Sequence, residues 1–433
     1  MTRSTLFTLI TAFILFSTHI HTISALFDGP PVVLIPGDGG CQLQATLNRT
    51  ATLHPYICQK TSGLFTLWLN LDEFVPYYFD CFIENMKLFY DPATRTSRDS
   101  EGVHVYIPGF GNTSTVEWLD PSKSSFGSYY THLVDALVAV GYERNVNIRG
   151  APYDFRKAPN EGGSYFWQLQ HLVEETYQKN GHEPVVLVSH SLGCLYALYF
   201  LNQQPTSWKN RFIRAWVPIS GPYAGTTKVM RVVTSGDNLN EYVISALTAR
   251  NAQRSYPSSV FLFPNTDYWS PEEIIITTPK ANYTTRNYTQ LFKDLNYTIG
   301  LDLLQDTQGL VKDIKAPDVP VFPVYGVEVP TEANYTYPGN SFPDTQPTIS
   351  MGLGDGTVNL RSLRAYRKWR NEQYPPVREY EVKGPTGEHS AILAEKSVFR
   401  FIINEVLFPF IKLNSTTSKK RSKLSPRKSP KLT

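Results

Sequence analysis

Short apolar runs alternate with amphipathic segments along most of the chain. The runs typical of buried strands are Pro31–Gly37, Pro184–Ser191, Ile213–Ser220, Val319–Gly326 and Val377–Gly384. Apolar residues recur at helical spacing in Tyr130–Tyr142, Tyr165–Gly181, Cys194–Pro205 and Ser397–Phe408. Strands that alternate with helices indicate a parallel sheet with both faces covered. We therefore predict an α/β domain over about residues 26–410.

Two stretches interrupt this alternation. Residues from about 50 to 120 are rich in aromatic side chains and are predicted to be loop-like. Residues from about 226 to 318 contain three Asn-x-Ser/Thr sites and show no clear rhythm of strands and helices. We predict that both are insertions on the core sheet, the first a small subdomain and the second a larger cap.

The two ends differ in composition from the body of the chain. Residues 1–25 combine Arg3, an apolar run from Leu6 to Phe16 and small residues near Ala25, which predicts a secretory signal peptide. The run is too short to cross a bilayer, which takes about 20 residues; the alternative is an uncleaved anchor. Residues 411–433 are basic, contain Ser and Pro, and are predicted to be disordered.

The charge distribution argues against nucleic-acid binding. The formal net charge is +3, but seven Lys and Arg residues follow Asn414, and without these and Arg3 the net charge is about −5. The basic tail has no interleaved aromatic residues and is not part of a folded face. No cluster of His, Cys, Asp or Glu has metal-ligand spacing, so neither a metal nor a cofactor is predicted.

Sequons and cysteines point to the secretory pathway. Seven Asn-x-Ser/Thr sites are expected to lie on the surface of a lumenal or extracellular protein: Asn48, Asn112, Asn282, Asn287, Asn296, Asn334 and Asn414. The four cysteines allow one or two disulfides. Cys58 and Cys81, which flank an aromatic-rich segment, are the favoured pair.

Ser191 lies between a predicted strand and a predicted helix, within Ser-His-Ser-Leu-Gly at residues 189–193. In a nucleophile elbow, a strained turn holds a serine at the carboxyl edge of a sheet, and small neighbours are needed because the backbone is close. Gly193 fits this pattern, whereas Ser189 stands where glycine is usual. We predict that Ser191 is a nucleophile; the alternative is a small residue in a tight turn.

The α/β-hydrolase order of nucleophile, acid and histidine requires a histidine after Ser191. Of nine histidines only His389 follows it, in a loop between the last predicted strand and helix. We predict that His389 is the general base; the alternative is an exposed loop histidine. Asp355 lies between two glycines that let the backbone present its carboxylate to an imidazole, and is predicted to be the acid. His190 is expected to help orient the elbow rather than act as base.

An oxyanion hole needs two backbone N–H donors. One is expected from Leu192, the residue after the serine. The other is expected from Asp38, in the glycine-rich loop that follows the first strand. An ionised Asp38 side chain near an oxyanion would be costly, which favours activity at acidic pH.

With these residues placed, the chain resembles the lecithin:cholesterol acyltransferase family, and most closely its lysosomal (group XV) phospholipase A2 branch. The resemblance covers nearly the whole mature chain and rests on the ordered segments "PPVVLIPGDGGCQL", "LWLNLDEF", "IPGFGNT", "LDPSKSS", "RGAPYDFR", "SHSLG", "SGDN" and "GDGTVNL". Asp38 matches the lysosomal branch, whereas Cys194 matches the plasma sterol acyltransferase. Cys41 stands where both branches have asparagine, so Cys41 and Cys194 could be thiols or a disulfide.

The resemblance implies an α/β-hydrolase core, a membrane-binding subdomain with a Cys58–Cys81 disulfide, and a mobile lid around "TSGDNLNEY" in the cap. It implies a bilayer contact through Leu67, Trp68 and Leu69, although the residues alone are equally compatible with a core position.

The implied activity is that of a calcium-independent phospholipase and transacylase. It would work at a phospholipid membrane or lipoprotein surface, with water or a lipid alcohol such as ceramide as acceptor, in the lysosomal lumen or outside the cell. A phosphatidylcholine-sterol acyltransferase and a lipid-binding protein without turnover are the alternatives.

Overall fold

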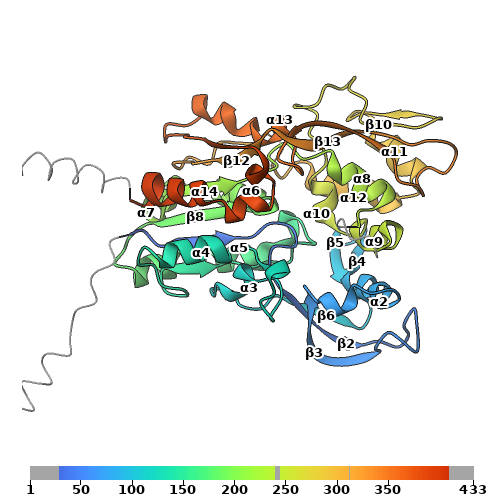
Figure 1. Cartoon of the computed structure of the whole chain (residues 1–433), viewed down its shortest axis with the longest axis horizontal. Coiled ribbons are helices and arrows are strands. Elements are labelled where there is room, and N and C mark those ends of the chain that lie inside the picture. The colour runs from blue at the N-terminus through green and yellow to red at the C-terminus, as the bar shows by residue number, and fades with distance from the viewer. Residues whose placement is uncertain (1–28, 239–243, 312, 409–433) are drawn as a thin grey trace, which may run out of the picture.

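The computed structural model describes residues 29–238, 244–311 and 313–408. Its centre is a sheet of six parallel strands in the order β15-β12-β9-β8-β1-β7 (Figure 1). Along the chain these are β1 (Val32–Ile35), β7 (Ile148–Gly150), β8 (Val185–His190), β9 (Ile213–Ile219), β12 (Val324–Val327) and β15 (Tyr380–Lys383). All residues of β1 and β8 are buried, as expected of central strands covered on both faces. The predicted α/β fold is confirmed.

Helices cover both faces of this sheet (Figure 1). They are α4 (Thr131–Val138), α5 (Gly163–Lys179), α6 (Leu192–Gln203), α7 (Thr206–Phe212) and α14 (Lys396–Phe401), the last continuing as a π-helical turn over Ile402–Leu407. Helix α6 follows β8 directly and buries nine of its twelve residues, because it is apolar on almost every side. It ends at Gln203, since Gln204 precedes Pro205 and is extended.

Two of the predicted strands are shorter than the apolar pattern suggests. The run Val319–Gly326 becomes a strand only at Val324, and Val377–Gly384 only at Tyr380. Prolines explain the first difference, because Pro320 and Pro323 have no N–H to donate to a sheet. Strand β7 was not predicted, because three residues are too few to show a period.

Residues from about 50 to 120 are predicted to be loop-like, but the structure shows a subdomain with regular strands and helices at one end of the molecule (Figure 1). A three-stranded antiparallel sheet combines β2 (Leu43–Asn48), β3 (Thr61–Trp68) and β6 (Val103–Tyr106). A second hairpin pairs β4 (Leu88–Asp91) with β5 (Thr96–Asp99). Helix α2 (Tyr78–Met86) completes the subdomain, whereas α3 (Ser114–Glu117) lies beside α4 of the core (Figure 1). Short, half-exposed antiparallel strands have weak apolar patterns, which explains the missed elements.

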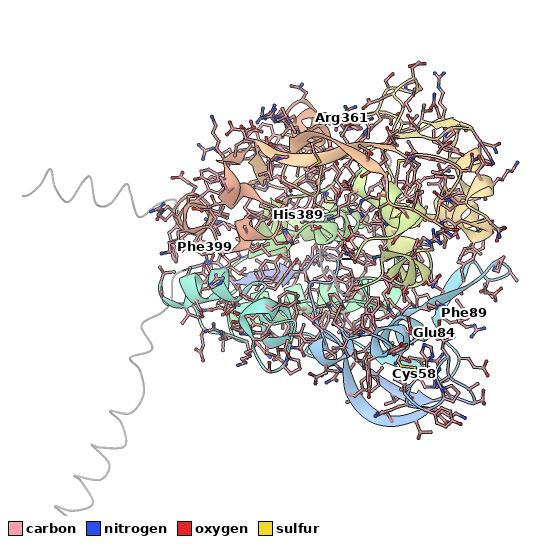
Figure 2. All side chains as sticks on the ribbon, turned by 45° about the vertical axis from the view of Figure 1, so that its right-hand side comes forward. Cys58, Glu84, Phe89, Arg361, His389 and Phe399 are labelled. Carbon is pink, nitrogen blue, oxygen red and sulfur yellow. A yellow bond between two sulfur atoms is a disulfide. The ribbon has the colours of Figure 1, made fainter. Side chains whose placement is uncertain are left out.

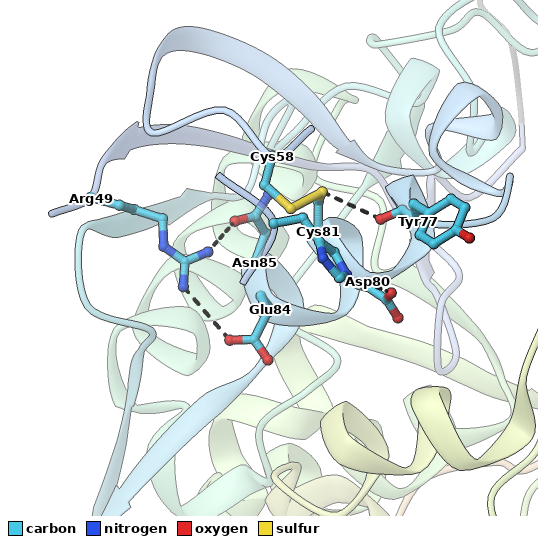
Figure 3. The surroundings of a disulfide bond; sticks show 8 residues. Arg49, Cys58, Tyr77, Asp80, Cys81, Glu84 and Asn85 are labelled. Carbon is cyan, nitrogen blue, oxygen red and sulfur yellow. Dashed lines mark hydrogen bonds and ion pairs between the residues drawn. A yellow bond between two sulfur atoms is a disulfide. The ribbon is translucent and has the colours of Figure 1, made fainter. Parts of the chain in front are cut away.

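A disulfide joins Cys81 of α2 to Cys58 in the loop before β3 (Figure 3). Beside it, the Arg49 guanidinium donates to the Asn85 side-chain oxygen at 2.9 Å and lies 3.8 Å from the Glu84 carboxylate. The covalent bond and this polar cluster tie the helix to the strands of the subdomain.

The segment predicted to be a cap, from about 226 to 318, contains short helices: α8 (Lys228–Ser235), α9 (Ala246–Gln253), α10 (Pro257–Phe261), α11 (Tyr288–Asp294) and α12 (Thr298–Thr307). A four-stranded sheet that was not predicted lies beside it, formed by β10 (Ile276–Thr277), β11 (Asn282–Tyr283), β13 (Val329–Thr336) and β14 (Thr348–Gly354). Each cap helix has ten residues or fewer, so none gave a long periodic signal. The expected signal peptide, basic tail and residues 239–243 of the expected lid lie outside the described residues.

Candidate active site

Ser191 lies in a sharp turn between β8 and α6. Its φ of 52° is in the left-handed region that non-glycine residues rarely adopt, and its N–H donates to Ile219 O on β9 at 2.9 Å. Gly193 is required because a Cβ atom there would lie 2.2 Å from Pro36 O. Ser189, in place of the usual glycine, is buried and accepts a hydrogen bond from Trp216 Nε1 at 2.8 Å. The strand, turn and helix form the geometry of a nucleophile elbow.

Ser191, His389 and Asp355 form one hydrogen-bonded chain. His389 Nε2 lies 2.9 Å from Ser191 Oγ, and His389 Nδ1 lies 2.8 Å from Asp355 Oδ2. Asp355 follows β14, whereas His389 lies in a loop after β15 near the centre of the molecule (Figure 2). Both side chains are buried. The fold therefore brings together three residues that span almost 200 positions of sequence.

The hydrogen bonds around Asp355 determine the tautomer of His389. One carboxylate oxygen accepts the backbone N–H groups of Thr357 and Val358 at 3.0 and 2.7 Å, while the other faces His389 Nδ1. Since an ionised carboxylate only accepts, Nδ1 carries the proton and Nε2 is free to accept one from Ser191. The backbone N–H of His389 also donates to the backbone carbonyl oxygen of Asp355 at 2.7 Å, so the loop is held in place as well as the ring.

Asp38 follows β1 in a loop that approaches the serine closely. A Cβ atom on the preceding Gly37 would lie 2.7 Å from Ser191 Cβ, so the loop needs glycine at this position. The Asp38 side chain is exposed to the cavity beside Ser191, and its low-polarity surroundings raise the pKa of that carboxyl to about 6. Leu192 is the first residue of α6 and is buried.

Ser191 lines a cavity of about 360 Å³ that lies between the N-terminal subdomain and the helices α8 and α9. Apolar side chains dominate its walls: Phe79, Phe82, Ile83 and Met86 from α2, Val229 and Val232 from α8, and Ile244, Ala249 and Ala252 around α9. Such a lining suits an acyl chain, with its reactive carbonyl at Ser191. No sequence pattern identifies these wall residues, because they come from residues 50–120 and 226–318, whose helices and strands are too short to show a clear period.

Comparison with known proteins agrees with this geometry. A family profile described as lecithin:cholesterol acyltransferase matches residues 64–314 and 307–396. The lysosomal phospholipase A and acyltransferase of Bos taurus is 46% identical over 381 residues, 88% of this chain and 92% of the relative. The phosphatidylcholine-sterol acyltransferase of Gallus gallus is 38% identical over 356 residues, 82% of this chain and 85% of the relative. The chain belongs to the lecithin:cholesterol acyltransferase family.

One expectation from this family resemblance needs correction. Leu67 and Leu69 do not face solvent, since they are 0% and 4% exposed. The side chain of Leu67, in β3, packs in the core, and Leu69, the residue after the end of β3, is buried as well. Trp68 is half-buried, donates from Nε1 to Gly39 O at 2.8 Å and stacks on Phe82. Trp68 therefore connects the subdomain to the loop after β1, and the buried Leu67 and Leu69 do not form a solvent-facing surface that could contact a bilayer.

Other apolar side chains of the subdomain do reach solvent. They are Leu53, Tyr56, Leu64, Leu71, Val75, Tyr77, Tyr78, Phe89 and Tyr106, and Leu64 is 61% exposed. No helix of the described residues is long and apolar enough to cross a membrane.

Cys41 and Cys194 are buried free thiols and not a disulfide. Cys41 Sγ donates to Tyr153 O at 3.1 Å, and Cys194 Sγ lies 3.4 Å from Ile219 O behind the elbow. Burial raises the pKa of both thiols to about 12, so they stay protonated. In the described ranges, no group of three or more His, Cys, Asp or Glu residues could hold a metal ion.

The sequons differ in accessibility. Asn48, Asn112, Asn282 and Asn296 are exposed, whereas Asn287 and Asn334 are half-buried. Asn334 donates from its side-chain nitrogen to Ile274 O at 2.6 Å, a bond that a glycan on the same nitrogen would alter. Asn414 lies outside the described residues.

Proposed function

We propose that this protein is a serine phospholipase and transacylase that removes acyl chains from glycerophospholipids through an acyl-serine intermediate. The observation that carries the proposal is the hydrogen-bonded chain Ser191–His389–Asp355, whose serine and histidine line an apolar cavity. The relatives named lysosomal phospholipase A and acyltransferase support the same reaction and are more similar than the sterol acyltransferases.

In the first half of the reaction His389 Nε2 takes the proton of Ser191 Oγ, which attacks the ester carbonyl. Asp355 stabilises the imidazolium that forms. The oxyanion is stabilised by the backbone N–H groups of Leu192 and Asp38. The tetrahedral intermediate then collapses, His389 returns the proton to the leaving alcohol, and the acyl group remains on Ser191.

In the second half an acceptor hydroxyl replaces the leaving alcohol. Water gives a free fatty acid, and a lipid alcohol such as ceramide gives an acylated lipid. His389 removes the acceptor proton and then returns it to Ser191. No calcium ion takes part, since the charge of the oxyanion is met by backbone donors. An apolar cavity favours a lipid acceptor, because it excludes water from the acyl-enzyme.

The rest of the chain adapts this chemistry to a lipid surface. The proposed arrangement is a hydrolase domain over residues 26–410, a membrane-contacting subdomain within about 50–120, and a cap with a lid within about 226–318. The exposed apolar side chains of the subdomain, Leu64 among them, would contact a phospholipid membrane or lipoprotein particle. The predicted signal peptide and the sequons support a location in the lysosomal lumen or outside the cell.

The proposal is tested with phosphatidylcholine liposomes that contain a short-chain ceramide. Release of fatty acid and formation of acylceramide are measured at about pH 4.5 and about pH 7.4, with and without a chelator. Wild type is compared with Ser191→Ala, which keeps the fold but lacks the nucleophile. We expect both products from wild type only, unchanged by the chelator, with more product at the acidic pH.

Two further measurements separate the alternatives. If cholesterol is acylated in place of ceramide, the protein is a sterol acyltransferase. A fluorophosphonate that labels wild type but not Ser191→Ala indicates a reactive serine. Folded wild type that gives neither product nor label would overturn the enzyme proposal in favour of a lipid-binding protein without turnover.

A further inference from the structure

A second hydrogen-bond chain passes beneath Ser191, separate from the triad. The Gly37 N–H lies 2.9 Å from the Tyr129 hydroxyl oxygen. That oxygen lies 2.5 Å from His190 Nδ1, and His190 Nε2 lies 2.9 Å from His389 O. His190 is 2% exposed and Tyr129 is half-buried. Two side chains thus connect the loop after β1 to the loop that holds His389.

The ends of this chain determine the direction of every hydrogen bond in it. The His389 carbonyl only accepts, so His190 Nε2 must carry the proton. Nδ1 of the neutral ring then accepts from the Tyr129 hydroxyl. The Tyr129 oxygen is left to accept from the Gly37 N–H, which only donates. One proton arrangement satisfies all three bonds, and it requires a neutral His190.

The two ends are the parts of the site that must stay in place during the reaction. Gly37 precedes Asp38, whose N–H is the second proposed oxyanion donor. His389 is the proposed base, and its carbonyl oxygen is the atom that His190 binds. His190 itself adjoins Ser191, so the chain connects both loops to the elbow.

We propose that Tyr129 and His190 are positioning residues that hold the oxyanion loop and the loop of His389 in fixed positions on either side of Ser191. This inference rests on the proposed hydrolase function and concerns the same site. Neither side chain needs to touch the substrate. They act through Gly37 and His389, whose backbones they bind.

The environment keeps His190 in the state that the chain needs. Burial and the neighbouring His389 ring hold the pKa of His190 well below its usual range, which favours the neutral ring that the hydrogen bonds require. The groups that face the ring are the Tyr129 hydroxyl and the His389 ring and carbonyl. Burial also raises the pKa of Tyr129, which keeps its proton available to donate.

A positioning role predicts a loss in kcat rather than in KM, because oxyanion donors act when charge develops in the transition state. Tyr129→Phe removes the hydroxyl and breaks two of the three bonds. With a water-soluble ester we expect kcat to fall about 10- to 100-fold while KM stays within about twofold. Rates are expressed per active site titrated with a fluorophosphonate, so unfolded protein does not count.

Tyr130→Phe is the matched control. Tyr130 is the next residue, fully buried, and its hydroxyl donates to Ile35 O at 3.0 Å without entering the chain. The change also removes one buried hydroxyl, so it reports the general cost to the fold. We expect its kcat per titrated site to stay within about twofold of wild type.

Variants of His190 test separately the hydrogen bonds that its two ring nitrogens make with Tyr129 and with His389. His190→Gln places an amide nitrogen near Nε2, so it keeps a donor for His389 O but leaves Tyr129 without its acceptor. His190→Asn places an amide oxygen near Nδ1, so it keeps an acceptor for Tyr129 but leaves the His389 carbonyl without its donor. We expect both to lower kcat, and Tyr129→Phe combined with His190→Gln to lose far less than the product of the two single losses. These variants also test the inference if Tyr129→Phe does not fold.

The outcomes separate the inference from the function on which it rests. Wild type that shows no serine-dependent turnover would refute both. Active wild type with Tyr129→Phe equal to Tyr130→Phe, or with single losses that multiply, would refute the positioning role alone. A selective loss of kcat in Tyr129→Phe and both His190 variants supports it.

Discussion

Replacing Asp38 by asparagine should remove a pH-dependent obstacle to catalysis. The pKa of Asp38 is raised to about 6 because its surroundings disfavour the charged form. Below this pH the carboxyl is neutral, and above it a negative charge shares the cavity with the developing oxyanion. The contribution of Asp38 therefore favours activity in acid and is lost as the pH rises through about 6.

The size of the effect follows from this pKa. With a pKa of about 6, about 3% of Asp38 is ionised at pH 4.5 and about 97% at pH 7.5. If only the neutral form supports turnover, ionisation costs about 30-fold across this interval, or about 2 kcal/mol. Two charges about 6 Å apart at an effective dielectric constant of 20 repel by about 2.8 kcal/mol, which is enough.

The assay is kcat/KM for a water-soluble ester, measured for Asp38→Asn and wild type at the same series of pH values. In the ratio of kcat/KM of the variant to that of wild type, the effects of all groups that titrate equally in both proteins cancel. We expect this ratio to rise about 30-fold from pH 4.5 to 7.5, with a midpoint near 6.

A matched control distinguishes an effect on the oxyanion from an effect on stability. Glu73 also has a raised pKa, about 7, because of burial, but it does not line the cavity. Glu73→Gln should therefore give a ratio that does not change with pH. A flat ratio for Asp38→Asn, or an equal slope for both variants, would refute the reasoning.

Three further predictions concern the triad, the disulfide and the surface. Asp355→Asn should lower kcat by about 10⁴-fold per folded molecule, because His389 would then bind as the wrong tautomer; circular dichroism checks the fold. Cys58→Ser should cost about 3 kcal/mol of unfolding free energy, since the bridge closes a loop of 23 residues; denaturant titration would show no shift if the bridge is absent. Leu64→Ser should weaken turnover on liposomes but not on a soluble ester, whereas Leu67→Ser should lower the melting temperature; the reverse pattern would restore Leu67 as the membrane contact.

Much of the catalytic site could be predicted from local sequence. The strand, turn and helix around Ser191 have a chemical signature of their own, because the elbow demands a small residue at Gly193. Only His389 follows the serine, so the order of the triad left one candidate base. The flanking glycines favour Asp355 as the acid, and in the structure its Oδ2 lies 2.8 Å from His389 Nδ1.

The insertions could not be predicted in the same way. Their helices and strands are short, so no period extends far enough to identify them. The apolar segment Leu67–Leu69 has no feature that separates a core residue from one that contacts lipid. The burial of a side chain depends on its tertiary contacts, and Trp68 binds Gly39 O, which lies 29 positions earlier in the sequence.

The sequence by itself determined the reacting groups and the type of fold, because periodicity, turn chemistry and residue order are local properties. The tertiary structure decided what surrounds those groups. Tyr129 and His190 lie 61 positions apart, and neither carries a signal that it binds the other. The cavity walls likewise join α2 to the cap across a gap in sequence. Such contacts follow from packing of the whole chain, so they become visible only once it is folded.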